Sequence, residues 1–174
     1  MKKILITILF PIHFFSFYVL FYNQPINKQK NTSKSEKKVN NFLVNGIDVS
    51  HHQGSINWSK VKQDSVAFCF IKSTEGSSFL DKNYKKNVKE CRQNNILTGV
   101  YHFYKGRSNP KKQFENLKKN VNPNDLDFPP VIDLEYHTNE YLKHPKHKRK
   151  FITDLKVFEK LVRDYYRMED LYRK

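Results

Sequence analysis

The stretch "FPPVIDLEYH" (128–137) brings two carboxylates to the end of an apolar run, and it indicates the type of fold. Val131 and Ile132 belong in a protein core, whereas Asp133 and Glu135 are costly to bury there. Residues i and i+2 of a strand project to the same face, roughly 6.6–6.8 Å apart along the backbone. The stretch therefore predicts a buried strand that carries two acids into one cavity.

Three similar runs precede this strand, and helical patterns alternate with them. The runs are "NGIDVS" (45–50), "VAFCFIK" (66–72) and "LTGVYHFY" (97–104). Strands that alternate with helices and are apolar on both faces predict a parallel sheet covered by helices. The predicted fold class is therefore α/β.

Local signals place the helices. A helical turn or two is expected around Trp58, and Asp81 is expected to cap the next helix. Asn109 and Pro110 provide a cap and a first position for the third helix. The last helix follows "KHPKHKRK" (143–150), which we interpret as a solvated loop. The apolar positions expected to face the core are Val61; Tyr84, Val88 and Cys91; Phe114, Leu117 and Val121; and Phe151, Leu155, Phe158, Leu161, Val162 and Tyr165.

Polar residues collect where the predicted strands end. Asp48 and the turn "SHHQG" follow the first strand, Glu75 follows the second, and His102 lies at the end of the third. The acid pair ends the fourth. Because the carboxyl ends of parallel strands meet at one edge of a sheet, we expect these groups to converge there.

The acid pair suits one kind of chemistry. Mutual repulsion and partial burial should raise the proton affinity of either Asp133 or Glu135. Glycosidic cleavage requires such a pair, since one carboxyl protonates the leaving oxygen and the other stabilises the oxocarbenium-like centre. The alternative is a pair of structural salt bridges or helix caps, and the short D-x-E spacing alone leaves both interpretations open.

Four motifs in order narrow the choice. The set "GIDVSHHQG", "KSTEG", "GVYHFY" and "PVIDLE" resembles the glycoside hydrolase family 25 lysozymes, the Chalaropsis-type muramidases, from about Gly46 to Glu135. The resemblance implies a (β/α) barrel of the TIM type. It also implies hydrolysis of the β-1,4 bond between N-acetylmuramic acid and N-acetylglucosamine in peptidoglycan glycan strands, with no metal or organic cofactor.

The resemblance also implies roles for individual residues. Glu135 matches the general acid, and Asp133 matches the partner that orients or stabilises the substrate's acetamido group. Asp48 matches the acid of the first strand's D-x-S motif. Retention of configuration through the acetamido group is the implied outcome, since N-acetyl sugars permit substrate assistance. The residues matched to the sugar cleft and its rim are Glu75, Tyr101, His102 and Tyr104.

A zinc site is the rival interpretation of these polar groups. His51, His52 and His102, together with Asp48 and Asp133, suggest the ligands of metal-dependent polysaccharide deacetylases. Adjacent histidines on an extended segment face opposite ways, however, and no H-x-x-x-H helix pair is present. We therefore expect no metal.

The two cysteines do not form a dense disulfide framework. Cys69 lies in a strand-like run and Cys91 on a helical stripe, so we interpret both as small buried hydrophobes. A bridge between them is left open.

The N-terminal part predicts export. Two lysines precede an apolar run over residues 4–21, which is typical of an export signal, although its length also allows a membrane anchor. Residues 1–22 are expected to be a signal peptide or membrane anchor, 23–41 a disordered Lys/Asn-rich linker, and 42–174 the partial catalytic domain. The protein is expected to be secreted or anchored to the cell envelope.

Charge points to the partners. The chain has 32 basic and 17 acidic residues and a formal net charge of +15, which favours anionic partners. Since no nucleic-acid-binding motif accompanies this charge, we expect no nucleic acid and instead expect anionic wall polymers beside the glycan strands.

The number of strands bears on activity. Four strand–helix units are present, whereas a barrel of this type has eight. We therefore expect the N-terminal half of a barrel, with its first and fourth strands as open edges through which chains could self-associate. The first hypothesis is an enzyme, a peptidoglycan hydrolase. The alternative is a truncated, catalytically inactive wall-binding remnant.

Overall fold

The structure, a computed structural model, describes residues 44–135 and 144–166, all within one compact unit, Val44–Lys174. The predicted export signal, the linker and the start of the domain near Phe42 lie outside the described residues and stay predictions. Among the helices in the described ranges, none combines the length and the apolar character needed to cross a membrane.

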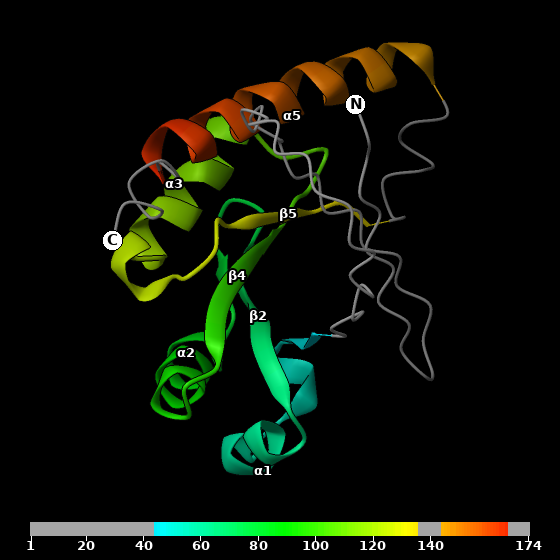
Figure 1. Ribbon diagram of the computed structural model, residues 1–174. Coiled ribbons are helices and arrows are strands. Elements are labelled where there is room, and N and C mark those ends of the chain that lie inside the picture. Colours follow the sequence, from blue (N-terminus) through cyan, green and yellow to red (C-terminus); the bar gives the residue numbers. More distant parts are fainter. Residues whose placement is uncertain (1–43, 136–143, 167–174) are drawn as a thin grey trace, which may run out of the picture. The chain divides into compact units, whose positions relative to one another are not determined.

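Four parallel strands form the sheet in the order β1-β2-β4-β5 (Figure 1). β1 and β5 are the edges of this described sheet, as the sequence predicted, while self-association through them stays a prediction. A short strand, β3, pairs antiparallel with the end of β2. The bounds are β1 Asn45–Val49, β2 Val66–Glu75, β3 Phe79–Leu80, β4 Leu97–Phe103 and β5 Val131–Asp133.

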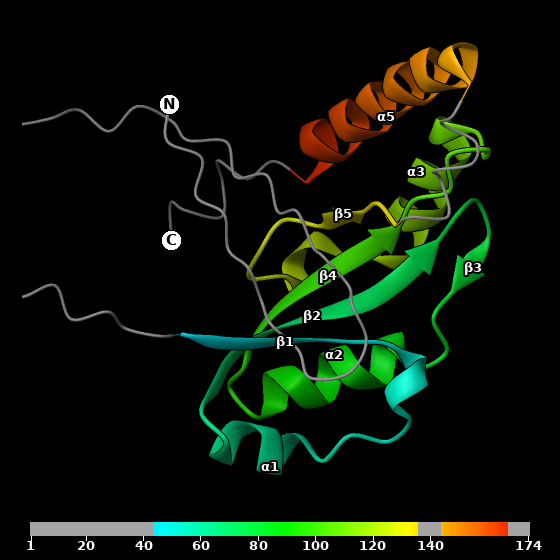
Figure 2. The ribbon, with the colours of Figure 1, turned by 90° about the vertical axis from the view of Figure 1, so that its right-hand side faces the viewer.

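Helices connect the strands, and α2 packs against β2 and β4 (Figure 2). The Asn109 side chain accepts hydrogen bonds from the backbone N–H groups of Lys111 and Lys112, which confirms the predicted cap and the helix start at Pro110. The bounds are α1 Trp58–Gln63, α2 Tyr84–Gln93, α3 Pro110–Asn120 and α5 Pro145–Tyr165, with 3₁₀ turns at His51–Gln53 and Pro123–Asp125.

The helices cover one face of the sheet. Cys91 of α2 contacts Thr98 of β4, and both Gln113 of α3 and Phe158 of α5 contact His102 of the same strand. Since side chains alternate along a strand, Thr98 and His102 share a face. The core lies between this face and the helices, and its largest fully buried apolar side chains include Tyr104, Phe158, Ile71, Ile96 and Leu117.

Most predicted core positions are confirmed, including Phe114 and Leu117 of α3 and Val121 just after it. Tyr165 is an exception, because 40% of its surface is exposed. The stretch 143–150 was predicted to be a loop, which is wrong for its described part: the helix α5 already begins at Pro145, with the His144 side chain accepting a hydrogen bond at its N-cap.

Two strand lengths also differ from expectation. β2 does not end at residue 72 but continues to Glu75, because Thr74 and Glu75 pair with both β3 and β4. β5 is shorter than expected and ends at Asp133, so Glu135 lies just beyond the strand.

The cap predicted at Asp81 is only partly present. Its carboxylate accepts a hydrogen bond from the backbone N–H of Asn83, the residue at the N-cap of α2. Its other oxygen binds the backbone N–H and the ring of His51, far away in the sequence.

Candidate active site

The strand register places four polar residues on the face of the sheet opposite the helices. Asp48 of β1 pairs with Phe70 of β2, and the alternation along β2 puts Lys72 on the same face. Lys72 pairs with Tyr101 of β4, and one strand further Phe103 pairs with Asp133. Paired residues of parallel strands project to the same side, so Asp48, Lys72, Tyr101 and Asp133 share this face near the carboxyl ends of the strands. We call it the carboxylate face.

Asp133 is the most perturbed acid of this face. Its surface is only 7% exposed, and burial is the main cause that raises its pKa to about 7. The negative charge of Glu135 is the second cause, the nearby charge of Lys72 opposes the shift, and Asp48 adds to it. The sequence left open which member of the acid pair has the raised proton affinity, and the structure raises that of Asp133.

Asp48 and Tyr101 are neighbours in the same electrostatic environment. Burial raises the pKa of Asp48, although a hydrogen bond from its own backbone works against this. Burial, followed by the charges of Asp48 and Asp133, raises the pKa of Tyr101 far above its usual range. The Tyr101 side chain also hydrogen-bonds Ser50, the residue that caps the turn after β1. Tyr101 therefore lies beside two acids as a neutral phenol.

Lys72 and Glu75 bring opposite charges to the rim of the carboxylate face. The Nζ atom of Lys72 lies 2.7 Å from one oxygen of Glu75, and Nζ of Lys105 lies 2.6 Å from the other. Partial burial alone would raise the pKa of Glu75, but the hydrogen bonds from Lys105 and Lys72 outweigh it and lower the pKa. Glu75 is thus an ionised carboxylate that already holds two ammonium groups.

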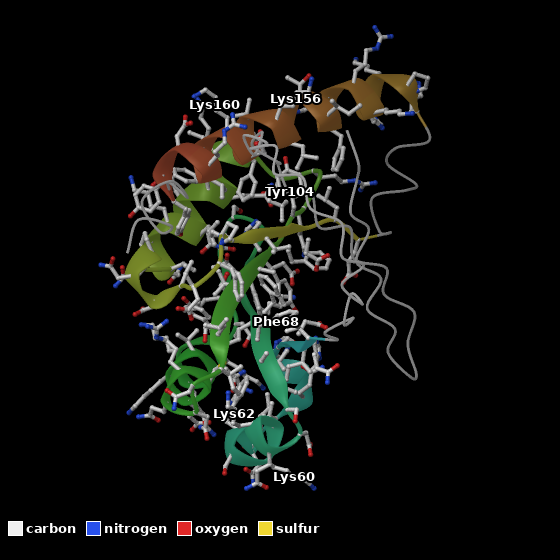
Figure 3. All side chains as sticks on the ribbon, in the orientation of Figure 1. Lys60, Lys62, Phe68, Tyr104, Lys156 and Lys160 are labelled. Carbon is white, nitrogen blue, oxygen red and sulfur yellow. The ribbon has the colours of Figure 1, made fainter. Side chains whose placement is uncertain are left out.

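Aromatic rings form the base of the carboxylate face. Phe68, Phe70 and Phe128 pack together, with ring centroids 5.5–6.0 Å apart. Phe68 is labelled on the sheet in Figure 3. Two glycines make room for these rings: a Cβ on Gly46 would lie 2.1 Å from the ring of Phe68, and one on Gly99 would lie 2.3 Å from the ring of Phe70. The two glycines therefore leave the space that the rings of Phe68 and Phe70 occupy.

Two residues matched to the sugar cleft lie elsewhere. His102 is fully buried on the helix-covered face, where Thr74 donates to its Nδ1 atom at 2.8 Å and its Nε2 atom donates to Gln113 at 3.3 Å. Burial lowers the pKa of His102 to about 4, so the ring is neutral. Tyr104 packs against Phe151 and Phe158 of α5 (Figure 3). The structure does not bring either side chain to the acids, and their contact with sugar stays a prediction without geometric support.

Sequence reasoning missed two members of the site. The sequence pattern placed Lys72 at the end of an apolar run, whereas β2 continues to Glu75 and Lys72 is a buried charge inside the strand. His51 was considered only as a zinc ligand, whereas its Nδ1 atom lies 2.6 Å from Asp81, a carboxylate with no exposed side-chain surface. This pair holds the turn after β1 in place. The sequence also offered a way to assign His102 correctly. Because successive side chains of a strand point to opposite faces, Tyr101 and His102 of β4 cannot both face the acids.

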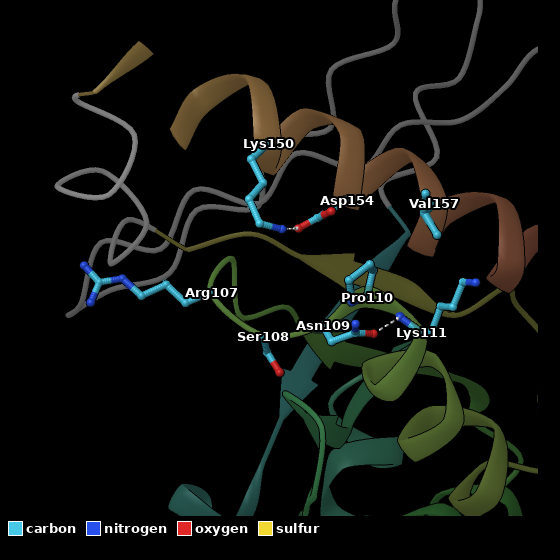
Figure 4. A pocket seen from close by; sticks show the side chains of 8 residues that line it. All are labelled: Arg107, Ser108, Asn109, Pro110, Lys111, Lys150, Asp154 and Val157. Carbon is cyan, nitrogen blue, oxygen red and sulfur yellow. Dashed lines mark hydrogen bonds and ion pairs between the residues drawn. The ribbon is translucent and has the colours of Figure 1, made fainter. Parts of the chain in front are cut away.

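Two cavities of the described structure lie away from the acids. One, of about 360 Å³, lies between α5 and the start of α3 and is shown in Figure 4. It is lined by Arg107, Ser108, Asn109, Pro110, Lys111, Lys150, Asp154 and Val157. The other, of about 510 Å³, lies between α2 and the segment after α3. Within residues 44–135 and 144–166, no group of three His, Cys, Asp or Glu side chains is arranged to hold a metal ion.

The site can both donate and accept protons near neutral pH. A carboxyl with a pKa of about 7 is present in both protonation states at pH 7, and Glu135 and Asp48 are close enough to influence it. Two acids that differ in their environment are the requirement for acid-catalysed cleavage of a glycosidic bond.

Known proteins share this arrangement of motifs and strands. Residues 47–173 match the family model described as "Glycosyl hydrolases family 25". The chain is 38% identical over 98 residues to lysozyme M1 of Streptomyces globisporus, which covers 54% of this chain and 33% of that protein. It is 29% identical over 92 residues to the autolytic lysozyme of Clostridium acetobutylicum, covering 53% and 28%.

The fold agrees with these matches. A family 25 glycosyl hydrolase from Bacillus anthracis superposes with a TM-score of 0.66 at 30% identity, over 77% of this chain and 63% of that one. This confirms the predicted half of a (β/α) barrel. The matched regions span about a third of the length of the curated relatives. With its family model matched from β1 into the last helix and its half-barrel superposed on a member, the chain belongs to family 25 of the glycosyl hydrolases.

Proposed function

We propose that the protein is a peptidoglycan hydrolase, a muramidase that cleaves the β-1,4 bond between N-acetylmuramic acid and N-acetylglucosamine. Family membership and the lysozyme names of its relatives support this. The observation that carries it is the convergence of Asp48, Asp133 and Glu135 at one end of the sheet, where Asp133 has a pKa of about 7.

The three acids have different roles in the reaction. Glu135 donates its proton to the glycosidic oxygen as the bond to the anomeric carbon breaks. The substrate's acetamido oxygen then attacks that carbon, and ionised Asp133 accepts a hydrogen bond from the acetamido N–H and stabilises the positive charge that develops. Asp48 adds negative charge near Asp133, which favours the cationic centre. Water then opens the ring formed by the acetamido group, with Glu135 taking its proton, so the configuration is retained.

The environment favours this division. Asp133 is buried and close to two other acids, so in the free protein its ionised form is disfavoured. A bound acetamido N–H and a developing positive charge both stabilise that ionised form. The interaction is therefore stronger in the transition state than in the free protein, which is the condition for catalysis.

Activity is tested by the clearing of purified peptidoglycan, followed as turbidity. Glu135→Gln should abolish clearing, because general acid catalysis typically contributes about 10²–10⁴-fold. Asp48→Asn should weaken clearing severely. Glu115→Gln is the matched control, since Glu115 is exposed on α3, and it should leave the rate unchanged.

Two results would count against the proposal. Full clearing by the Glu135→Gln protein would remove the mechanism. A wild-type protein that binds walls but releases no reducing sugar from them would favour the wall-binding remnant instead.

The compartment follows from the substrate. Peptidoglycan lies outside the cytoplasmic membrane, so a hydrolase of this polymer must be exported. The basic and apolar start of the sequence supports export as a secreted or envelope-anchored protein.

A further inference from the structure

The two cysteines of the chain meet in the core. Cys69 and Cys91 both have 0% of their surface exposed, and each thiol is the other's hydrogen-bond partner. The sequence contains no further cysteine, so the two can pair in only one way within a chain. In the structure both are free thiols.

Thr98 lies next to both cysteines. Cys69 of β2 is paired in register with Thr98 of β4, and paired residues of neighbouring strands lie about 4.8 Å apart. The hydroxyl of Thr98 donates to the sulfur of Cys91 at 3.2 Å. The helix α2 thus presents Cys91 directly above the point where β2 and β4 carry Cys69 and Thr98.

We propose that Cys69 and Cys91 form an intramolecular disulfide that fastens α2 to the central strand β2 once the protein meets an oxidising environment. Its biological setting rests on the export proposed above, whereas the chemistry of the pair does not. The bridge would fix the strand that carries Lys72, so it would stabilise the base of the carboxylate face.

The chemistry is an exchange with a low-molecular-weight disulfide such as oxidised glutathione. The Cys91 thiolate attacks one sulfur of that disulfide, which forms a mixed disulfide and releases one glutathione thiolate. Cys69 then loses its proton and attacks the sulfur of Cys91, which releases the second glutathione. Two protein thiols are oxidised, and one glutathione disulfide is reduced to two thiols.

The surroundings make Cys91 the attacking sulfur. Hydrogen bonds from Cys69 and Thr98 outweigh burial and lower the pKa of Cys91, whereas the hydrogen bond to Cys91 and burial raise the pKa of Cys69. The thiolate is the reactive form, so the first step falls to Cys91. Because neither sulfur is exposed, the reaction has to await local opening of α2.

The test uses the full chain, purified with reduced thiols and incubated with oxidised glutathione until its modification pattern no longer changes. The protein is then denatured in excess iodoacetamide and digested, and its peptides are weighed. A linked pair of peptides containing Cys69 and Cys91, from monomeric protein, supports the proposal. Two alkylated cysteines, a stable glutathione adduct or a disulfide between chains would each overturn it.

Two variants make the result specific. The oxidised wild type should melt higher than the reduced one by roughly 10 °C, since a bridge restricts the unfolded chain. The Cys69→Ala/Cys91→Ala protein should show no effect of glutathione on its melting temperature. Thr98→Val removes the hydroxyl donor at nearly constant volume and should slow bridge formation several-fold without changing the end point. Equal rates would contradict the role of Thr98.

This outcome is separate from catalysis. Neither sulfur lies on the carboxylate face, so an open pair of thiols would leave the proposed hydrolase untouched. Loss of peptidoglycan clearing in Glu135→Gln likewise says nothing about the bridge.

Discussion

Glu135 lies close enough to Asp133 for its negative charge to raise the pKa of that neighbour. Burial is the larger cause, and together with the charge of Asp48 the two effects bring the pKa to about 7 despite the opposing charge of Lys72. Asp133 is therefore partly protonated at neutral pH. Both the rate of the proposed reaction and the stability of the fold should respond to pH in this range.

The pH dependence of the rate tests the role of Asp133. The proposed step needs Asp133 ionised while Glu135 is still protonated, so kcat/KM should follow a bell-shaped pH profile whose alkaline limb falls near pH 7, where the pair loses its last proton. Asp133→Asn should be severely weakened and should lose the limb near pH 7. The measurement is the clearing of peptidoglycan between about pH 5 and 9, a range that brackets the pKa of Asp133. A limb near pH 7 that persists unchanged in Asp133→Asn would show that another group causes it.

The free energy of unfolding should depend on pH through two groups, Asp133 and His102, which act in opposite directions. The pKa of Asp133 is raised from 3.8, its ordinary value, to about 7 in the folded protein. The protonated carboxyl therefore stabilises the fold fully below about pH 4, and this stabilisation is lost as the pH rises through 7. The pKa of His102 is lowered from 6.5 to about 4, so stability is instead lost as pH falls from 6.5 through 4. Each effect amounts to at most about 3–4 kcal/mol.

Single variants should separate these effects. Asp133→Asn should leave a protein whose free energy of unfolding rises between pH 4 and 6.5, as His102 dictates. His102→Gln should leave one whose stability falls from pH 4 to 7, as Asp133 dictates. Urea denaturation at a series of pH values measures both, and parallel curves for the two variants would contradict the assignment.

The two lysines that bind Glu75 should differ in their effect on Asp133. The charge of Lys72, whose side chain is 8% exposed, lowers the pKa of Asp133, whereas the Lys105 side chain is 55% exposed and solvent screens its charge. Lys72→Met should therefore raise the pKa of Asp133 further, and Lys105→Met should leave it nearly unchanged. An NMR titration of the Asp133 carboxyl carbon compares the two. Equal shifts in both variants would mean that Lys72 acts only through Glu75.

Gly99 should be intolerant of a side chain. A Cβ there would lie 2.3 Å from the ring of Phe70, so Gly99→Ala should destabilise the fold by roughly 1–3 kcal/mol through overpacking. Phe70→Leu removes the ring edge, and the double variant should therefore lose less stability than the sum of the single changes. Thermal melts of the four proteins complete the cycle, and strict additivity would show that the ring is not the obstacle.

Binding to whole cell walls should weaken as salt rises, since basic side chains meet anionic polymers through screened interactions. The first turn of α5 contains no acid, and its exposed Lys148 and Arg149 lie at the positive end of the helix. Lys148→Glu/Arg149→Glu should bind less than a control with the same charge change at the negative end of a helix, Lys118→Glu/Lys119→Glu in the last turn of α3. Equal losses in a wall pull-down would mean that only net charge matters, and binding that salt does not alter would make the charge incidental.

Local pattern was enough to locate the elements and the acids. Asn109 followed by Pro110 starts a helix wherever the chain goes next, because the cap satisfies N–H groups within the same turn. The alternation of strands and helices likewise gave the parallel sheet, and the apolar run before Asp133 placed this acid at the end of a strand. These features depend on residues within a few positions of one another.

Partners across the sheet needed the tertiary structure. A register shift between Lys72 and Thr74 lets Lys72 face Asp133 while Thr74 turns to His102 on the other side. No local pattern encodes such a shift, because it depends on how β2 fits both of its neighbours.

The sequence by itself determined the family, the strand–helix alternation and the three acids, since each follows from residue type and spacing along the chain. Only the tertiary structure decided that Asp133 has the raised pKa, that Asp81 holds His51 and that Cys69 meets Cys91. The reason is physical: a pKa, an ion pair and a thiol contact are set by burial and by distances between residues far apart in the sequence, and these distances exist only once the strands have paired and the helices have covered them.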